Sequence, residues 1–178
     1  LQKLNIDLTQ DIDFSNFHIN NIINYYNNCE NTVNIGIVGK YTGKNDTYLS
    51  IVRALEHAGF SNNTLININW ISDDAINDTI LSEQDGLVIP GGFGVRGIED
   101  MLYAAQYARE NNIPILGICL GLQIMIIEIA RNVLKYENAN SEEFDLLTEY
   151  PVIKNIEDIC KIYKGGTQIT GLQEIDIE

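Results

Sequence analysis

Basic residues are scarce in this chain of 178 residues, which carries 11 Lys and Arg against 25 Asp and Glu and has a net charge of −14. An acidic surface repels nucleic-acid phosphates and anionic lipid headgroups. No cluster of Lys and Arg offsets this charge, so we expect no nucleic-acid partner and no membrane partner. The apolar fraction of 45% is that of a globular protein with one sizeable core.

Cysteines and long apolar runs are also scarce. The three cysteines, Cys29, Cys119 and Cys160, lie too far apart for a C-x-x-C metal or redox pair and leave an odd number for disulfides. No run of about 18 apolar residues is present, and the first residues lack the pattern of a signal peptide. We therefore expect a cytoplasmic protein in a reducing compartment, without a metal site.

The apolar residues recur with periods that predict alternating strands and helices. Apolar strands are expected at residues 33–38, 86–89 and 113–118, a strand with one more polar face at 65–71, and helices at 46–57, 98–110 and 120–133. Gly59 is expected to stop the first of these helices, and the last is apolar enough to be packed on several sides. This order predicts an α/β fold, a doubly wound and mostly parallel sheet with helices on both faces.

The two ends of the chain are less regular. Residues 1–32 are rich in Asn and have an apolar spacing that fits one amphipathic helix, which we interpret as a linker or packing helix from a preceding domain. Beyond Glu143 only two strands are expected, one near Val152 and one in the last dozen residues. We assign the α/β domain to residues 33–178.

In a parallel sheet, ligands bind at the carboxyl ends of the strands, and the most informative turn there is Gly117-Ile118-Cys119-Leu120-Gly121. Its form, G-x-C-x-G between a strand and a helix, has the spacing of a nucleophile elbow with Cys in place of Ser. The glycines let strand and helix approach closely, while the amino end of the helix favours a thiolate and offers amides to an oxyanion. We interpret Cys119 as a nucleophile in preference to a buried small residue.

The turn after the third predicted strand, residues 90–97, reads Pro-Gly-Gly-Phe-Gly-Val-Arg-Gly and is called the glycine loop below. Gly92, Gly94 and Gly97 form G-x-G-x-x-G, a dinucleotide-binding pattern. That pattern also needs an acidic residue about 20 positions on, whereas the next strand ends at Cys119 with no carboxylate. We favour a role in an oxyanion hole that faces the cysteine, and a plain connecting loop stays an alternative.

The turn after the first predicted strand, residues 39–46, resembles a phosphate-binding P-loop only in part. Asn45 follows the second lysine, where a P-loop requires Ser or Thr. We expect a mobile loop over the site, with a helix cap at Asp46. Its lysines, Lys40 and Lys44, either meet an anion or lie in solvent.

A cysteine nucleophile needs a base, usually a histidine oriented by a carboxylate. The chain has two histidines, His18 in the leading segment and His57 near the end of the helix predicted at 46–57. A helix that leaves the carboxyl edge of a sheet ends at the opposite edge, so we expect His57 to lie at the surface and far from Cys119. The sequence therefore predicts a nucleophile whose base is missing from the chain.

Together these residues resemble the glutamine amidotransferase domain of the CTP synthase family, a class I, triad-type amidotransferase, and the resemblance implies a flavodoxin-like fold. The resemblance covers roughly residues 33–145. It is carried by residues 35–43, 48–50, 85–86, 90–97, 117–123, Glu128, 130–133, 138–141 and 143–144. Class I amidotransferases share the glycine loop and the cysteine turn, whereas the Gly-Lys-Tyr at 39–41 and the Glu-Asn-Ala-Asn-Ser at 137–141 are similar to CTP synthases in particular.

The resemblance implies a chemistry for five residues. Cys119 would attack the side-chain amide of glutamine, form a glutamyl thioester and release ammonia. Gly92 and Leu120 match residues whose backbone amides hold the oxyanion. Gln123 and Glu143 match contacts to the glutamine substrate, and a carboxylate is a suitable partner for its α-ammonium group.

The family also implies what lies around this domain. Ammonia passes through a tunnel to a synthetase domain of the same polypeptide, which aminates UTP to CTP with ATP and Mg²⁺. GTP is an allosteric effector whose site lies near the position of Phe93 and residues 42–46. The amidotransferase domain itself needs no cofactor, and the full enzyme is expected to be a homo-oligomer, a tetramer.

The sequence departs from the family in its last third. The family's catalytic His and Glu form an H-x-E pair, which does not occur in this sequence, and Gln168-Ile169-Thr170 replaces the Met-Arg-Leu that follows the family's Gly-Gly-Thr. We expect residues 33–178 to be an amidotransferase domain that is truncated at its carboxyl end and inactive alone. A catalytically silent regulatory or assembly domain of the same fold and another cysteine hydrolase stay as alternatives.

Overall fold

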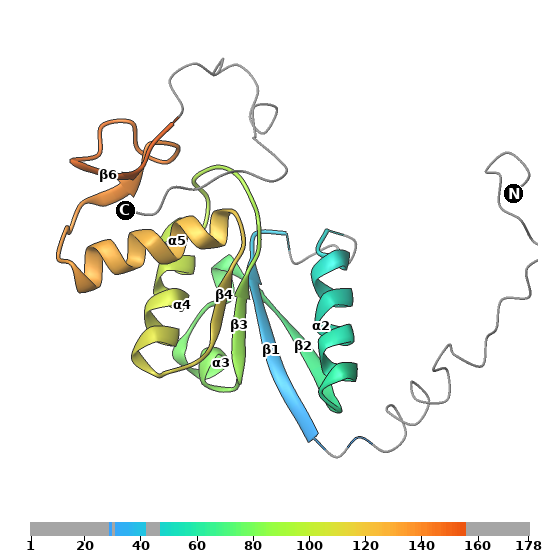
Figure 1. Cartoon of the computed structure of the whole chain (residues 1–178). Coiled ribbons are helices and arrows are strands. Elements are labelled where there is room, and N and C mark those ends of the chain that lie inside the picture. The colour runs from blue at the N-terminus through green and yellow to red at the C-terminus, as the bar shows by residue number, and fades with distance from the viewer. Residues whose placement is uncertain (1–28, 30, 42–46, 156–178) are drawn as a thin grey trace, which may run out of the picture. The chain divides into compact units, whose positions relative to one another are not determined.

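The computed structural model describes residues 29, 31–41 and 47–155 (Figure 1). In chain order its elements are β1 (Asn31–Gly39), α2 (Leu49–Ser61), β2 (Thr64–Ser72), a 3-10 turn (Asp73–Ala75), α3 (Asp78–Ser82), β3 (Gly86–Ile89), α4 (Ile98–Glu110), β4 (Ile115–Gly117), α5 (Leu120–Glu128), a π-helical turn (Ile129–Val133), β5 (Ala139–Ser141) and β6 (Tyr150–Ile153). The described residues divide into two compact units, a first unit of residues 29, 31–33 and 50–67 and a second unit of residues 34–41, 47–49 and 68–155. Every residue expected to bind or attack the substrate belongs to the second unit.

Four strands form one sheet in the order β2-β1-β3-β4. β1 pairs with β3 and β3 pairs with β4, both in parallel, through Ile37 opposite Val88 and Ile89 opposite Gly117. β2 lies on one side of β1, and β3 and β4 lie on the other, so the strand order reverses beside β1. Open parallel sheets bind ligands at such a switch point, outside the carboxyl ends of the strands.

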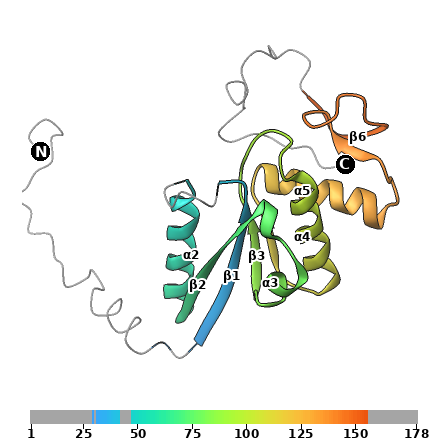
Figure 2. The ribbon, with the colours of Figure 1, turned by 180° about the vertical axis from the view of Figure 1, so that it is seen from behind.

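The core of the second unit joins the strands to α4 and α5. β3 is buried along its whole length, which fits an apolar strand covered on both faces. Figures 1 and 2 both show α4 and α5 side by side next to β4, and Arg109 of α4 reaches Glu128 of α5 at 2.8 Å. Glu128 is 2% exposed, so its charge is paired where it is buried.

One face of α5 is less covered than its apolar sequence predicts. Ile124 and Ile127 are buried, whereas Leu122, Ile126, Ile129 and Val133 are between 39% and 53% exposed. These four residues recur at helical spacing and share the opposite face. The prediction that this helix is packed on several sides is therefore wrong for the described residues. Its α-helical part also ends at Glu128, where a π-helical turn begins.

In the first unit, α2 runs two residues beyond the stop predicted at Gly59. Gly59 is buried inside the helix, and the amide of Asn62 still bonds the carbonyl of Ala58 at 3.0 Å. The helix ends at Ser61, and Asn63, two residues later, has a φ of 49°, the left-handed conformation that follows a helix carboxyl end. Asn can adopt this conformation as Gly does, which explains why the stop was placed too early.

Most other elements agree with the sequence predictions to within two residues at each end. The strand predicted near Val152 is confirmed as β6. Two short elements were missed: α3, which begins after the capping side chain of Asn77, and β5, which pairs in parallel with β6. The helix predicted within residues 1–32, the cap at Asp46 and the last strand lie outside the described residues. No helix in the described part of the chain is long and apolar enough to cross a membrane.

Candidate active site

Cys119 lies in the sharp turn that the G-x-C-x-G spacing predicts. It is separated from the end of β4 by Ile118 alone, precedes the first residue of α5 and is exposed. Its φ of 54° and ψ of −104° fall outside the regions that residues with a Cβ normally adopt. A conformation of this kind costs free energy and persists only where the surrounding structure enforces it.

The glycines on either side of Cys119 allow the close packing that holds this conformation. A Cβ on Gly117 would lie 2.5 Å from the Gly121 carbonyl carbon, and a Cβ on Gly121 would overlap the carbonyl of Ile89 in β3. The amide of Ile118 donates to the same Ile89 carbonyl at 2.9 Å. The strand, the turn and the helix therefore approach as closely as backbone allows, as the sequence predicts.

The glycine loop lies against this turn. A Cβ on Gly91 would lie 3.6 Å from the Cys119 Cβ, and a Cβ on Gly92 would lie 3.0 Å from Leu120 Cδ2. The side chain of Leu120 is buried, and its amide occupies the first turn of α5, where amides have no partner within the helix. The structure thus brings Gly92, Leu120 and Cys119 together, while Phe93 is exposed at the outer part of the loop.

Lys40 follows β1 and does not lie in solvent. It is 7% exposed, and its ammonium donates to the carbonyls of Phe93 at 3.3 Å and Gly94 at 2.5 Å. Burial and the neighbouring Arg96 guanidinium lower the pKa of Lys40, while Glu143 and Asp73 raise it. The alternative that this lysine lies in solvent is wrong, because the residue is buried and two of its three ammonium donors bond carbonyls of the glycine loop. Its contact with an anion stays a prediction. Lys44 lies outside the described residues.

Contacts of Arg96 with Lys40 and Asp73 hold the far end of the glycine loop. Arg96 donates to the Lys40 carbonyl at 2.5 Å, and its Nε lies 3.6 Å from Asp73 Oδ2. Asp73 is 4% exposed and packs so closely against Gly97, at the start of α4, that a Cβ there would overlap its carboxylate. A dinucleotide would place its pyrophosphate at this helix end. The buried carboxylate repels such a group, which weighs against the dinucleotide interpretation.

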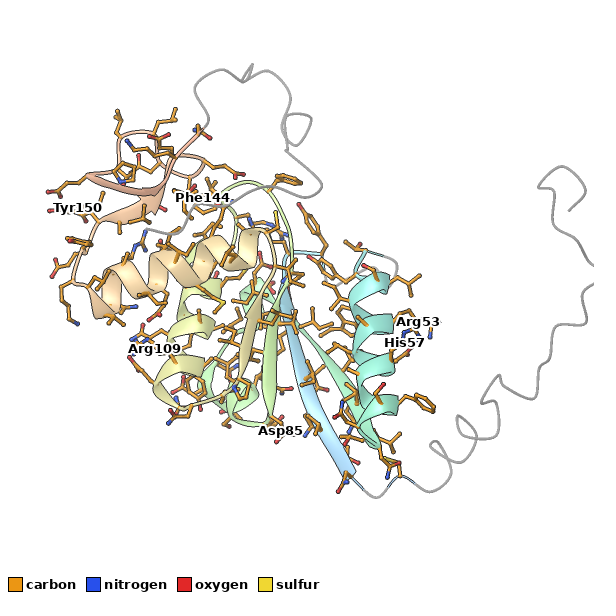
Figure 3. The ribbon with its side chains drawn as sticks, viewed as in Figure 1. Arg53, His57, Asp85, Arg109, Phe144 and Tyr150 are labelled. Atoms are coloured by element: carbon orange, nitrogen blue, oxygen red, sulfur yellow. The ribbon has the colours of Figure 1, made fainter. Side chains whose placement is uncertain are left out.

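Glu143 approaches the glycine loop from the segment after β5. Its Oε1 accepts a hydrogen bond from the Gly94 amide at 3.1 Å, and its side chain is otherwise exposed. Phe144, labelled in Figure 3, packs against the core cluster, and the amide of Glu143 donates to the buried Ser141 hydroxyl. The neighbouring residues therefore fix the backbone that carries this carboxylate.

Gln123 lies one turn into α5, where its amide donates to the Cys119 carbonyl at 3.2 Å. Its side-chain Oε1 is buried and has no hydrogen-bond partner among the described residues. A buried acceptor without a partner is costly, so such an atom is a candidate contact for a bound ligand.

A general base for Cys119 is not found in the described residues of the second unit, which contain no histidine. His57 lies in α2 of the first unit, exposed as predicted and labelled with Arg53 in Figure 3. Its expected distance from Cys119 stays a prediction, and His18 lies outside the described residues. The described residues also contain no group of three His, Cys, Asp or Glu placed to hold a metal ion.

A cavity of about 410 Å³ lies elsewhere in the second unit. Residues of the segment 137–149 line it together with Arg131. None of the predicted site residues is in its lining, so it plays no part in the arrangement around Cys119.

Sequence reasoning missed the three charged residues that hold the glycine loop. Lys40 and Asp73 each come two residues after the end of a predicted strand, which is the one signal that they lie at the active edge of the sheet. Arg96 was visible only as a member of the loop. Their pairing joins positions more than 20 residues apart, and periodicity carries no information on such contacts.

Comparison with known proteins agrees with this geometry. Residues 45–170 match the family model for "Glutamine amidotransferase class-I". The CTP synthase of Clostridium acetobutylicum is 49% identical over 150 residues, which are 79% of this chain and 27% of that protein. The CTP synthase of Methanocaldococcus jannaschii is 45% identical over 182 residues, which are 96% of this chain and 33% of that protein. The chain thus spans a third or less of the length of these relatives.

A solved structure shows the same fold. The glutaminase domain of Trypanosoma brucei CTPS, solved with bound acivicin, matches with a TM-score of 0.66 and 36% sequence identity, over 72% of this chain and 52% of that one. The predicted mostly parallel, flavodoxin-like α/β architecture is confirmed. The predicted resemblance to the amidotransferase part of CTP synthases is confirmed by the same relatives. By the match of the family model over most of its residues, the chain belongs to the class I glutamine amidotransferases.

Proposed function

We propose that this chain supplies the glutamine-hydrolysing half of a CTP synthase, with Cys119 as the nucleophile. One observation carries the proposal: the strained Cys119 backbone places its Cβ against Gly91, at the amino end of α5 and beside the glycine loop. Close glycine packing stabilises this conformation, which a cysteine with a purely structural role would not require.

The reaction proceeds through a covalent intermediate. The Cys119 thiolate attacks the side-chain carboxamide carbon of glutamine, and the carbonyl oxygen becomes an oxyanion held by the amides of Gly92 and Leu120. The intermediate collapses to a γ-glutamyl thioester as the amide nitrogen takes a proton from a general acid and leaves as ammonia. Water then hydrolyses the thioester to glutamate and regenerates the thiol. The acid and base for these proton transfers come from residues outside the described part of the chain.

Two side chains are suited to recognise the substrate. The Glu143 carboxylate, bonded to Gly94 and otherwise exposed, pairs with the α-ammonium group of glutamine. The unpartnered Oε1 of Gln123 accepts a further hydrogen bond from the substrate. Both belong to the same unit as Cys119.

The relatives extend this proposal to the whole protein. We propose that the ammonia is used by a synthetase domain that aminates UTP to CTP with ATP and Mg²⁺, as one step of pyrimidine nucleotide synthesis in the cytoplasm. GTP acts as effector near the exposed Phe93, and the full enzyme is a homo-oligomer. These parts rest on similarity to CTP synthases, of which the chain covers a third or less.

Labelling with 6-diazo-5-oxo-norleucine tests the nucleophile. In the natural polypeptide that contains these residues, we expect one adduct per chain, found at Cys119 by peptide mass spectrometry and suppressed by excess glutamine. Cys29 is an internal control, since it belongs to the first unit and its thiol donates to the Asn63 carbonyl at 2.9 Å. Equal labelling of both cysteines, or labelling insensitive to glutamine, would refute the proposed mechanism.

A further inference from the structure

Lys40 is buried, and no carboxylate of the described residues is a direct hydrogen-bond partner of its ammonium. The two acceptors that it has are neutral carbonyls, those of Phe93 and Gly94, and both lie in the glycine loop. Burying a charge is costly unless hydrogen bonds satisfy it, and neutral carbonyls compensate less than an ion pair. A stability role alone would be served as well by an apolar side chain, so this arrangement needs another explanation.

The contacts of Lys40 concentrate on the peptides that follow the oxyanion donor. The Lys40 Cδ lies 3.9 Å from the position of a Cβ on Gly92, and its ammonium holds the carbonyls of the next two residues. A peptide plane whose carbonyl is hydrogen-bonded cannot rotate freely, so the direction of the loop's amides is restricted as well. The side chain therefore lies beside the Gly92 backbone and fixes the peptides that follow it.

The backbone of Lys40 is itself held from the same loop. Arg96 donates to the Lys40 carbonyl, and Arg96 contacts Asp73, which packs against Gly97 at the loop's far end. Gly94 and Gly97 both have positive φ, 79° and 66°, so the loop contains two residues in a glycine-favouring conformation on the carboxyl side of Gly92. Lys40 bonds the carbonyl of Gly94, and Asp73 packs against Gly97.

We propose that Lys40 is a positioning residue for the oxyanion hole: by binding the Phe93 and Gly94 carbonyls it holds the Gly92 amide in the direction of Cys119. Its catalytic consequence rests on the proposed function, while its effect on the loop does not. Lys40 touches no reacting atom, so its removal acts through Gly92. Loss of one oxyanion donor slows a reaction about 100- to 1,000-fold, and a misdirected donor is expected to cost part of that.

The test compares Lys40→Met with the wild type in the natural polypeptide. Met has similar length and no charge, so the core position stays filled. The matched control is Lys135→Met, since the Lys135 ammonium also donates to a backbone carbonyl, that of Asn132, outside the glycine loop. A second variant, Lys40→Arg, keeps the charge and the donors and serves as the rescue.

Three readouts separate positioning from general damage. Alkylation of Cys119 by 6-diazo-5-oxo-norleucine passes through an oxyanion, whereas alkylation by iodoacetamide does not. For Lys40→Met we expect the first rate to fall about 10- to 100-fold and the second to stay within about twofold of wild type. Amide hydrogen exchange across residues 91–96 should become about tenfold faster. Lys135→Met should change none of the three, and Lys40→Arg should recover part of the loss.

Two outcomes would overturn the proposal. Unchanged exchange of the glycine loop in Lys40→Met would show that the lysine does not hold it. Equal loss of both alkylation rates would show general unfolding in place of a directed effect. If the wild type itself is not labelled by the glutamine analogue, the proposed function fails, and hydrogen exchange alone then decides whether Lys40 holds the loop.

Discussion

The cysteine turn and the glycine loop meet at the same edge of the sheet but are held in place by different means. The turn at residues 117–121 is fixed by backbone packing, since a single methyl group at Gly121 would overlap the Ile89 carbonyl. The glycine loop makes no such close backbone approach at Gly94, where a Cβ would meet nothing within 4 Å. Its position depends on the side chains of Lys40, Arg96 and Asp73.

The two parts of the site have different requirements: the nucleophile must be held rigidly, whereas the oxyanion donor must point in the right direction. A nucleophile in a strained conformation needs close packing that prevents relaxation. An oxyanion donor needs a direction, and a few hydrogen bonds to neighbouring carbonyls can supply one. Substitutions should therefore act sterically in the turn and electrostatically in the loop.

Gly121→Ala is expected to have the largest effect. The new Cβ would overlap backbone, which cannot move aside as a flexible side chain can, so we expect a loss of about 3 kcal/mol or more in the free energy of unfolding. Urea unfolding of the natural polypeptide would measure it. Gly94→Ala is the matched control: with open space around it, only the cost of a positive φ applies, about 1–2 kcal/mol. Equal losses at the two glycines would contradict the comparison.

Asp73→Asn should have a smaller effect, confined to the loop. The amide keeps the shape but removes a buried negative charge from Arg96 and from the amino end of α4, for an expected cost of about 1–2 kcal/mol. Hydrogen exchange at residues 94–97 should rise with it. The neighbouring Asp74 is exposed in the same 3-10 turn, so Asp74→Asn should stay within about 0.5 kcal/mol of wild type. A larger effect at Asp74 would mean that net charge, and not the Arg96 contact, is responsible.

How far the sequence predicts the structure follows the same division. The turn at Cys119 was predictable because its cause is local: one glycine stands two positions before this residue and another two positions after it. The strand β3 was predictable because burial on both faces gives it a continuous apolar run, and β2 because polar and apolar residues alternate along it. The expectation that β4 is buried is wrong for Leu116, which is 56% exposed. Lys40, Asp73 and Arg96 were not recognised, because their contacts depend on which loops the sheet brings together. The exposed face of α5 was missed because composition alone does not tell which side of an apolar helix is covered.

Cys119→Gly tests the strain in the turn. Gly adopts a φ of 54° without the cost that a Cβ imposes, so Cys119→Gly should be more stable than Cys119→Ala by about 1 kcal/mol. Both variants lose the thiol, so their difference reports the backbone and not the nucleophile. At Ala58, within α2, Ala→Gly should instead destabilise by about 1 kcal/mol. A destabilising effect of Gly at both positions would mean that the Cys119 conformation is not strained.

The pH dependence of Lys40 is expected to be the smallest effect. Burial and Arg96 lower the pKa of Lys40 in the folded protein below its ordinary value of 10.5. Between these two values the unfolded chain binds more protons than the folded one, so stability gained from Lys40 rises with pH across that window. Below the folded pKa the lysine is protonated in both states and its burial cost is fully present. The free energy of unfolding of the wild type, relative to that of Lys40→Met, should therefore increase as the pH rises toward 10.5. Lys135→Met, compared in the same way, should show no such trend. A decrease in the free energy of unfolding of the wild type relative to Lys40→Met over this range would mean that the carbonyls of Phe93 and Gly94 stabilise the charged ammonium more than burial opposes it.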